Sequence, residues 1–89
     1  MIVNFDRSFS KSLDKVQDKQ IKERLRTLIV SMEKAKGITE LTAIKLMRGH
    51  TGFYRIRLGD YRVGFELTCN NEILLILVAH RKDIYKRFP

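Results

Sequence analysis

The stretch FYRIRLGDYRVGFE, from Phe53 to Glu66, decides the fold. It alternates bulky apolar residues with arginines and is interrupted once, by Gly59-Asp60. An alternation of period two is typical of β-strands, and a Gly-Asp pair between two such runs is typical of a tight hairpin turn. We therefore expect strands at about 53–58 and 61–67, with residues paired outward from the turn.

This pairing places the arginines of the hairpin on one face of the sheet. Arg57 then faces Arg62, and Arg55 faces Gly64. The opposite face collects apolar side chains and is a core face: Tyr54, Ile56, Leu58, Tyr61, Val63 and Phe65. Like charges directly opposite each other destabilise a sheet by about 0.2–1 kcal/mol per pair, and a glycine inside a strand often marks a close approach to the backbone. Since the planar guanidinium suits phosphate, we interpret this face as an anion-binding surface. The alternative is a solvated face in which Arg55 or Arg57 pairs with Glu66.

The N-terminal part of the sequence predicts a short strand and two helices. Residues 2–5 are expected to form the strand, and Asp6 or Ser8 to cap the first helix. The apolar positions at helical spacing are Phe9, Leu13 and Val16 in the first helix and Ile21, Leu25, Leu28, Ile29 and Met32 in the second. Gly37 is expected to end the second helix.

The C-terminal part predicts a third hairpin strand and a last helix. Residues 73–79 are apolar on both faces, which is typical of a central strand, and a short helix is expected at about 82–88. Residues 38–52 are expected to form a loop or a brief strand. The predicted fold is α+β: a small, antiparallel, four-stranded sheet with a mixed edge, an N-terminal helical hairpin packed on one face, and a short C-terminal helix. A chain of 89 residues is expected to be a single domain, 1–89.

Composition narrows the class of partner. Eighteen Lys and Arg against ten Asp and Glu give a formal net charge of +8. This charge favours a polyanionic partner, which is nucleic acid, an acidic lipid surface or an acidic protein, and charge alone does not choose among the three. A lone cysteine, Cys69, excludes an internal disulfide, and a cytoplasmic location fits best. We expect no membrane span, no cofactor and no metal, because the spacing of Cys69, His50 and His80 matches no common ligand pattern. Cys69 is expected to be partly buried near a turn.

The tail HRKDIYKRF adds candidate functional residues. The strand at 73–79 delivers His80 and Arg81 to one end of the sheet. Tyr85 follows Arg81 by four residues, so both point the same way if the tail is helical. Tyr85 then either stacks on a nucleic-acid base or packs the tail onto the sheet.

The strand order, the hairpin YRIRLGDYRV and the ending HRKDIY resemble the RelE/ParE toxin superfamily, over nearly the whole chain. The resemblance implies the RelE-like fold described above. For the RelE branch it implies a toxin of a type II toxin–antitoxin system that cuts mRNA in the ribosomal A site, without a metal ion. The implied partners are a cognate antitoxin protein, mRNA and the ribosome with its rRNA.

Carried over by position, the resemblance implies roles for residues of the hairpin and tail. Arg55 and Arg57 match two basic positions that are often lysine in the family, and Arg62 and Arg81 match family arginines. Tyr85 matches the tyrosine of the C-terminal element. The expected catalytic residues are Arg55, Arg62, His80, Arg81 and Tyr85, and the expected RNA-binding residues are Arg55, Arg57, Lys82 and Lys86. Because the ParE branch tends to lack this full set, the RelE branch is favoured.

The general base stays open at this point. The implied reaction is attack of a 2′-hydroxyl on the adjacent phosphate, which gives a cyclic phosphate and a free 5′-hydroxyl. Arginines suit the charge of its transition state, but arginine is not deprotonated in proteins, so Arg55 is a poor base. His80 is a candidate from its ordinary titration range, and Asp83 and Glu66 are outside candidates.

Two other functions remain alternatives. One is a ParE-like inhibitor of DNA gyrase with the same fold. The other is a nonenzymatic module that binds RNA or an acidic partner through its basic face.

Overall fold

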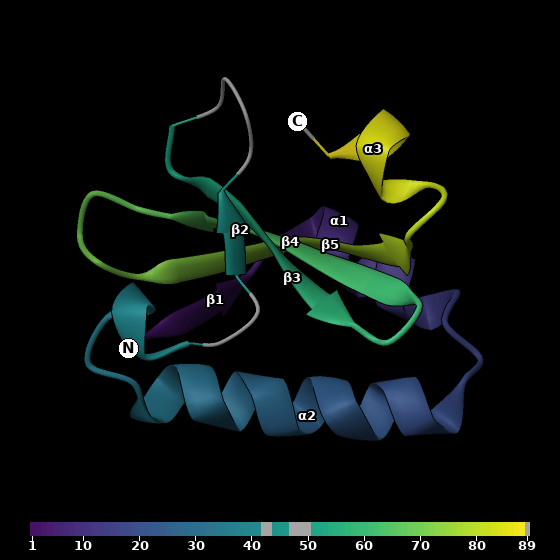
Figure 1. The fold of residues 1–89 in the computed structure, drawn as a ribbon, viewed down its shortest axis with the longest axis horizontal. Coiled ribbons are helices and arrows are strands. Elements are labelled where there is room, and N and C mark those ends of the chain that lie inside the picture. Colours follow the sequence, from purple (N-terminus) through teal and green to yellow (C-terminus); the bar gives the residue numbers. More distant parts are fainter. Residues whose placement is uncertain (42–43, 47–50, 89) are drawn as a thin grey trace.

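The computed structural model describes residues 1–41, 44–46 and 51–88, and Figure 1 shows a sheet flanked by helices. In chain order the elements are β1 (Val3–Phe5), α1 (Arg7–Asp14), α2 (Lys19–Lys34), a short 3-10 helix (Ile38–Glu40), β2 (Ile44–Leu46), β3 (Phe53–Leu58), β4 (Tyr61–Leu67), β5 (Ile73–His80) and α3 (Ile84–Arg87). The α+β class and the order of helices and long strands are those predicted from the sequence.

The sheet has five strands in the order β1-β5-β4-β3-β2, where four were expected. β1 runs parallel to β5, which gives the expected mixed edge, and the other pairs are antiparallel. The additional strand is β2, in which Ile44 pairs with Ile56 and Leu46 pairs with Tyr54. Three residues are too few for periodicity to separate a strand from a loop, so the sequence left both possibilities open.

The hairpin of β3 and β4 has the register predicted by counting outward from Gly59-Asp60. Arg57 pairs with Arg62, and Arg55 pairs with Gly64. Gly59 has a φ of +62°, which a type II′ turn requires at its first central position. The three arginines therefore extend from the face opposite the main core.

The main core lies between the sheet and the two N-terminal helices. Asp6 caps α1 by accepting from the Ser8 backbone N–H at 3.0 Å, and Asp18 caps α2. Apolar residues of the two helices pack against apolar residues of the strands. The helix residues include Phe9, Ile21, Leu25 and Met32, and the strand residues include Ile56, Val63, Phe65 and Leu75. The predicted end of the second helix at Gly37 is wrong, since α2 ends at Lys34. The backbone is extended at Ala35, and the Ala35 side chain is buried.

Two serines of α1 bind backbone groups of β5 where the sheet is irregular. The pairing of β4 with β5 shifts register between Gly64 and Phe65. On β5, the Val78 N–H donates to the Ser12 hydroxyl at 3.1 Å, and the Ser8 hydroxyl lies 2.7 Å from the carbonyl oxygen of Ile76. The two serines are four residues apart and so share one face of α1. Hydrogen bonds from α1 therefore complete the backbone pairing at the irregularity.

The C-terminal tail packs on part of the outer face of the sheet, and Figure 1 shows α3 beside the sheet. A second apolar cluster consists of Leu77, Ala79, Ile84 and Phe88, with Phe53 and Ile76 packed against it. A Cβ placed on Gly64 would lie 2.7 Å from the Phe88 ring. The predicted gap at Gly64 is therefore filled by the chain's own Phe88 and is not open to a ligand.

Two smaller observations concern the periphery. Cys69 is exposed, so the expectation of partial burial is wrong; the turn that carries it extends beyond the packed sheet. Within residues 1–41, 44–46 and 51–88, none of the helices is both long enough and apolar enough to cross a membrane.

Candidate functional site

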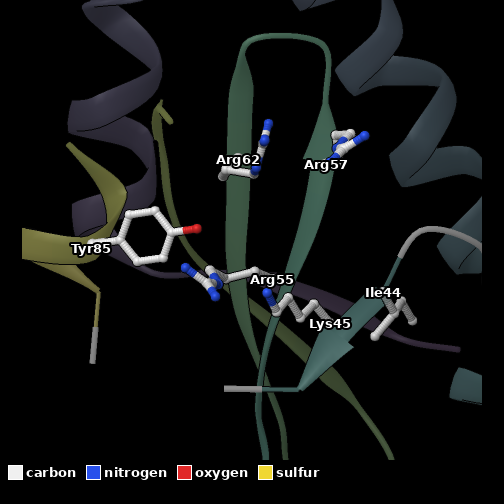
Figure 2. A pocket seen from close by; sticks show the side chains of 6 residues that line it. All are labelled: Ile44, Lys45, Arg55, Arg57, Arg62 and Tyr85. Carbon is white, nitrogen blue, oxygen red and sulfur yellow. The ribbon is translucent and has the colours of Figure 1, made fainter. Parts of the chain in front are cut away.

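A cationic pocket lies on the outer face of the sheet, and Figure 2 shows the side chains that line it. Its volume is about 310 Å³, and its lining comes from three elements: Ile44 and Lys45 of β2, Arg55, Arg57 and Arg62 of the hairpin, and Tyr85 of α3. Four of these six side chains carry a positive charge at neutral pH. The pocket therefore concentrates positive charge in a partly enclosed space, which suits an anion.

Arg55 is the most constrained residue of the pocket. It is 8% exposed, and its guanidinium carbon lies 4.3 Å from the centre of the Tyr85 ring, a cation–π contact. One guanidinium nitrogen, Nη1, is buried and donates no hydrogen bond. A buried charged donor without an acceptor is costly, so this atom is a strong candidate to bind an anionic ligand.

The other two arginines differ in how they are held. Arg62 donates from Nη1 to the carbonyl oxygens of Gly59 at 2.9 Å and Tyr61 at 2.8 Å, so the hairpin turn fixes its guanidinium. Arg57, on the neighbouring strand, is exposed. Neither Arg55 nor Arg57 forms a salt bridge with Glu66 or with any other described carboxylate. The alternative of an internally neutralised surface therefore does not describe this face.

Lys45 is a charged residue of the pocket that was not predicted from the sequence. It lies directly across from Arg55 in the pairing of β2 with β3. The available signal was the alternation Ile-Lys-Leu at 44–46, which sets the lysine apart from two apolar neighbours.

Of the tail residues Arg81, Lys82, Tyr85 and Lys86, one lines the pocket. Tyr85 lines the pocket. Arg81, Lys82 and Lys86 are exposed and do not line it. The expected alignment of Arg81 with Tyr85 fails because α3 begins at Ile84, so the four-residue helical spacing does not apply to Arg81.

His80 lies on the opposite side from the arginines. Its ring packs edge-on against Tyr61 at 5.6 Å between ring centres, and it lines a separate cavity with Ser12 and Val16 of the helical layer. Its Nδ1 accepts from the Lys82 backbone N–H at 3.2 Å. The structure therefore does not bring His80 to the arginine pocket.

No cluster of three or more His, Cys, Asp or Glu side chains that would hold a metal ion occurs in the part of the chain that the structure describes. Of the residues weighed for a zinc site, His50 lies outside the described residues. The described residues that line the pocket are four cations, an aromatic ring and the apolar Ile44, and none of them is a carboxylate.

Comparison with known proteins identifies the class to which this fold and pocket belong. The family model described as the ParE toxin of type II toxin–antitoxin systems, parDE, matches residues 3–85. The chain therefore belongs to this family of toxins, the RelE/ParE superfamily.

Individual relatives place the chain on the RelE branch. Toxin RelE3 of Methanocaldococcus jannaschii is 36% identical over 90 residues, which is 100% of both chains. The crystal structure of the RelB–RelE antitoxin–toxin complex from Methanococcus jannaschii matches at 32% identity with a TM-score of 0.83, over 97% of this chain and 99% of that one. The isolated E. coli RelE toxin, at 24% identity and a TM-score of 0.66 over 96% and 90% of the two chains, shows the shared fold.

Proposed function

We propose that this toxin is an endoribonuclease that cuts mRNA in the ribosomal A site and thereby inhibits translation. The observation that carries the proposal is the buried Arg55 Nη1, which has no hydrogen-bond partner and belongs to a pocket of four cations and one aromatic ring. A scissile phosphate supplies the acceptor oxygens that this guanidinium lacks. The adjacent Tyr85 ring supplies a surface on which a base can stack.

The chemistry is attack of the 2′-oxygen on the adjacent phosphorus, with departure of the 5′-oxygen. Negative charge accumulates on the phosphoryl oxygens in the transition state, and fixed cations stabilise it most effectively. Arg62 is held in place by the turn, and Arg55 is held by burial against Tyr85. These two guanidinium groups therefore supply preorganised positive charge, a role for which no metal ion is required.

Residues outside the pocket have a secondary part in this proposal. Arg81, Lys82 and Lys86 are exposed on the tail, and we assign them contacts to flanking mRNA or rRNA. Such contacts strengthen binding to any RNA. Their removal should therefore weaken ribosome binding without changing the dependence of binding on sequence or codon.

The test is cleavage on ribosomes programmed with a defined mRNA, with the cut site mapped by primer extension. The expected products are a cyclic 2′,3′-phosphate and a free 5′-hydroxyl, which accepts a labelled phosphate from a kinase without prior dephosphorylation. Arg62→Ala should abolish the product while ribosome affinity is nearly retained. Intact mRNA in cells that the toxin has arrested would exclude this function.

We further infer that a cognate antitoxin neutralises the toxin. The similar M. jannaschii toxin crystallised as a complex with RelB, and a toxin of net charge +8 suits an acidic binding segment. Coexpression with the protein encoded by an adjacent small gene should restore growth, and that protein should copurify with the toxin.

Inhibition of DNA gyrase is the second candidate, because the matching family model is that of the ParE toxin. Supercoiling by purified gyrase in the presence of the toxin separates the two functions. Unimpaired supercoiling together with mRNA cleavage supports the nuclease, and impaired supercoiling without cleavage supports gyrase as the target.

A further inference from the structure

We propose that Lys45 is a catalytic residue that donates the proton to the departing 5′-oxygen of the RNA. This inference rests on the proposed nuclease function. Lys45 lies on β2, in a segment for which the sequence allowed either a loop or a brief strand. The inference assigns a proton donor to a pocket whose other described cations are arginines.

The position of Lys45 follows from the sheet. β2 places it directly opposite Arg55, and β3 and β4 place Arg57 directly opposite Arg62. Two cross-strand pairs of like charge thus lie on one face, each at a cost of about 0.2–1 kcal/mol to folding. Figure 2 shows the Lys45 side chain directed toward the Arg55 guanidinium, and both residues line the same pocket. A fold stabilised for its own sake would separate these charges, so Lys45 belongs with the arginines to one anion site.

Proton transfer distinguishes lysine from its neighbours. Arginine does not give up a proton in proteins, so the three guanidinium groups stabilise charge without exchanging a proton with the leaving group. An ammonium group carries a proton at neutral pH and can release it to an alkoxide, which is far more basic. Among the described residues that line the pocket, Tyr85 is the other one with a transferable proton, but its donation would leave a phenolate beside the anionic phosphate product.

The step balances as follows. The 2′-oxygen forms a bond to phosphorus and loses its proton to water, while the bond from phosphorus to the 5′-oxygen breaks. The Lys45 ammonium gives one proton to that 5′-oxygen. The products are the cyclic phosphate, a 5′-hydroxyl and a neutral amine, which regains a proton from water.

The experiment compares two mRNAs in single-turnover cleavage on programmed ribosomes. One mRNA has a normal scissile linkage, and the other has sulfur in place of the bridging 5′-oxygen. A thiolate departs without a proton, so the second substrate needs no acid. Lys45→Arg keeps the charge but should reduce cleavage of the normal mRNA by about 10²–10⁴-fold, the usual contribution of general acid catalysis. On the sulfur substrate the same variant should cut at nearly the wild-type rate.

Controls separate the proton from charge and folding. Lys11→Arg, at an exposed position of α1 outside the pocket, should match wild type on both substrates. Wild-type rates for Lys45→Arg on normal mRNA, or equal losses on both substrates, would overturn the role as donor. A wild-type toxin that cuts neither mRNA would overturn the nuclease function itself, and this inference with it.

Discussion

Two polar side chains are buried in the described structure, and they lie on opposite sides of the sheet: Ser12 at 2% exposure and Arg55 at 8%. Ser12, on the helix side, donates to the Phe9 carbonyl oxygen at 2.8 Å and accepts from the Val78 N–H at 3.1 Å. Arg55, on the outer side, leaves Nη1 without a partner. Burial therefore has different consequences at the two sites.

The difference separates stability from function. Among the described residues, no buried side-chain nitrogen or oxygen on the helix side lacks a hydrogen bond. On the outer side, the chain's own side chains fill only the apolar region, where Phe88 packs over Gly64. At the boundary with the cationic region, a charged group has been desolvated without compensation, which is a cost to folding that a bound anion would offset.

The largest expected effect is on stability and tests the apolar region. Phe88→Ala removes the ring that fills the space at Gly64 and holds α3 against Leu77 and Ala79. The free energy of unfolding should fall by about 3–5 kcal/mol, as for other buried aromatic residues. Urea denaturation followed by circular dichroism measures it. Lys86→Ala, exposed on the same helix, should change it by less than about 0.5 kcal/mol. A loss below about 1 kcal/mol for Phe88→Ala would mean that α3 contributes little to this face.

The next prediction concerns Arg55 itself. Arg55→Met keeps an apolar stem under Tyr85 but removes the unpartnered charge. Single-turnover mRNA cleavage should fall by about 10²–10³-fold, as when one preorganised donor to a transition state is lost. The free energy of unfolding should stay the same or rise, because no buried charge then lacks an acceptor.

Arg26→Met is the matched control for the loss of one positive charge, since Arg26 is exposed on α2 and does not line the cationic pocket. It should leave both measurements nearly unchanged. If Arg55→Met destabilised the fold by several kcal/mol, Arg55 would have the structural role that Ser12 has.

A smaller effect is expected at Ser12. Ser12→Ala leaves the Val78 N–H buried without an acceptor, next to the irregular pairing of β4 and β5. The free energy of unfolding should fall by about 1–3 kcal/mol, while cleavage per folded molecule stays at the wild-type level. Ser10→Ala, exposed on the same helix, is the control and should change stability by less than about 0.5 kcal/mol. A cleavage defect in folded Ser12→Ala would link the two sides of the sheet.

Local pattern was sufficient for the parts of the fold that depend on neighbouring residues. The hairpin register follows from Gly59-Asp60 alone, because a tight turn fixes every pair beyond it. That register places Arg55, Arg57 and Arg62 on one face of the sheet, independently of contacts with distant residues. The helices followed in the same way from apolar spacing and from Asp6 as a cap.

The parts that the sequence did not predict depend on contacts between distant residues. Nothing near Gly64 indicates that Phe88, 24 positions later, fills the space above it. Lys45 joins the pocket because three residues of β2 pair with β3, and so short a strand has too little pattern to be recognised. His80 ends on the helix side because β5 shifts register against β4, which strict alternation along the strand does not reveal.

The smallest expected effect is a pH dependence on the helix side. Two hydrogen bonds from Ser8 to the Asp6 carboxylate lower the pKa of Asp6 below its usual value of 3.8. The Ser8 hydroxyl contributes most to this shift, and the Ser8 backbone N–H contributes less. A carboxyl whose pKa is lower when folded stabilises the fold above its unfolded pKa, and that stabilisation is lost as the pH falls through the folded value. The urea midpoint of wild type should therefore decline below about pH 4. Asp6→Asn still caps α1 but cannot titrate, so its midpoint should decline less steeply. Ser8→Ala keeps the carboxylate and the backbone donor, and should give an intermediate slope. Parallel curves of urea midpoint against pH for wild type and Asp6→Asn would show that the capping carboxylate contributes no acid sensitivity. The hydrogen-bonded groups of the helix side would then not limit stability at low pH.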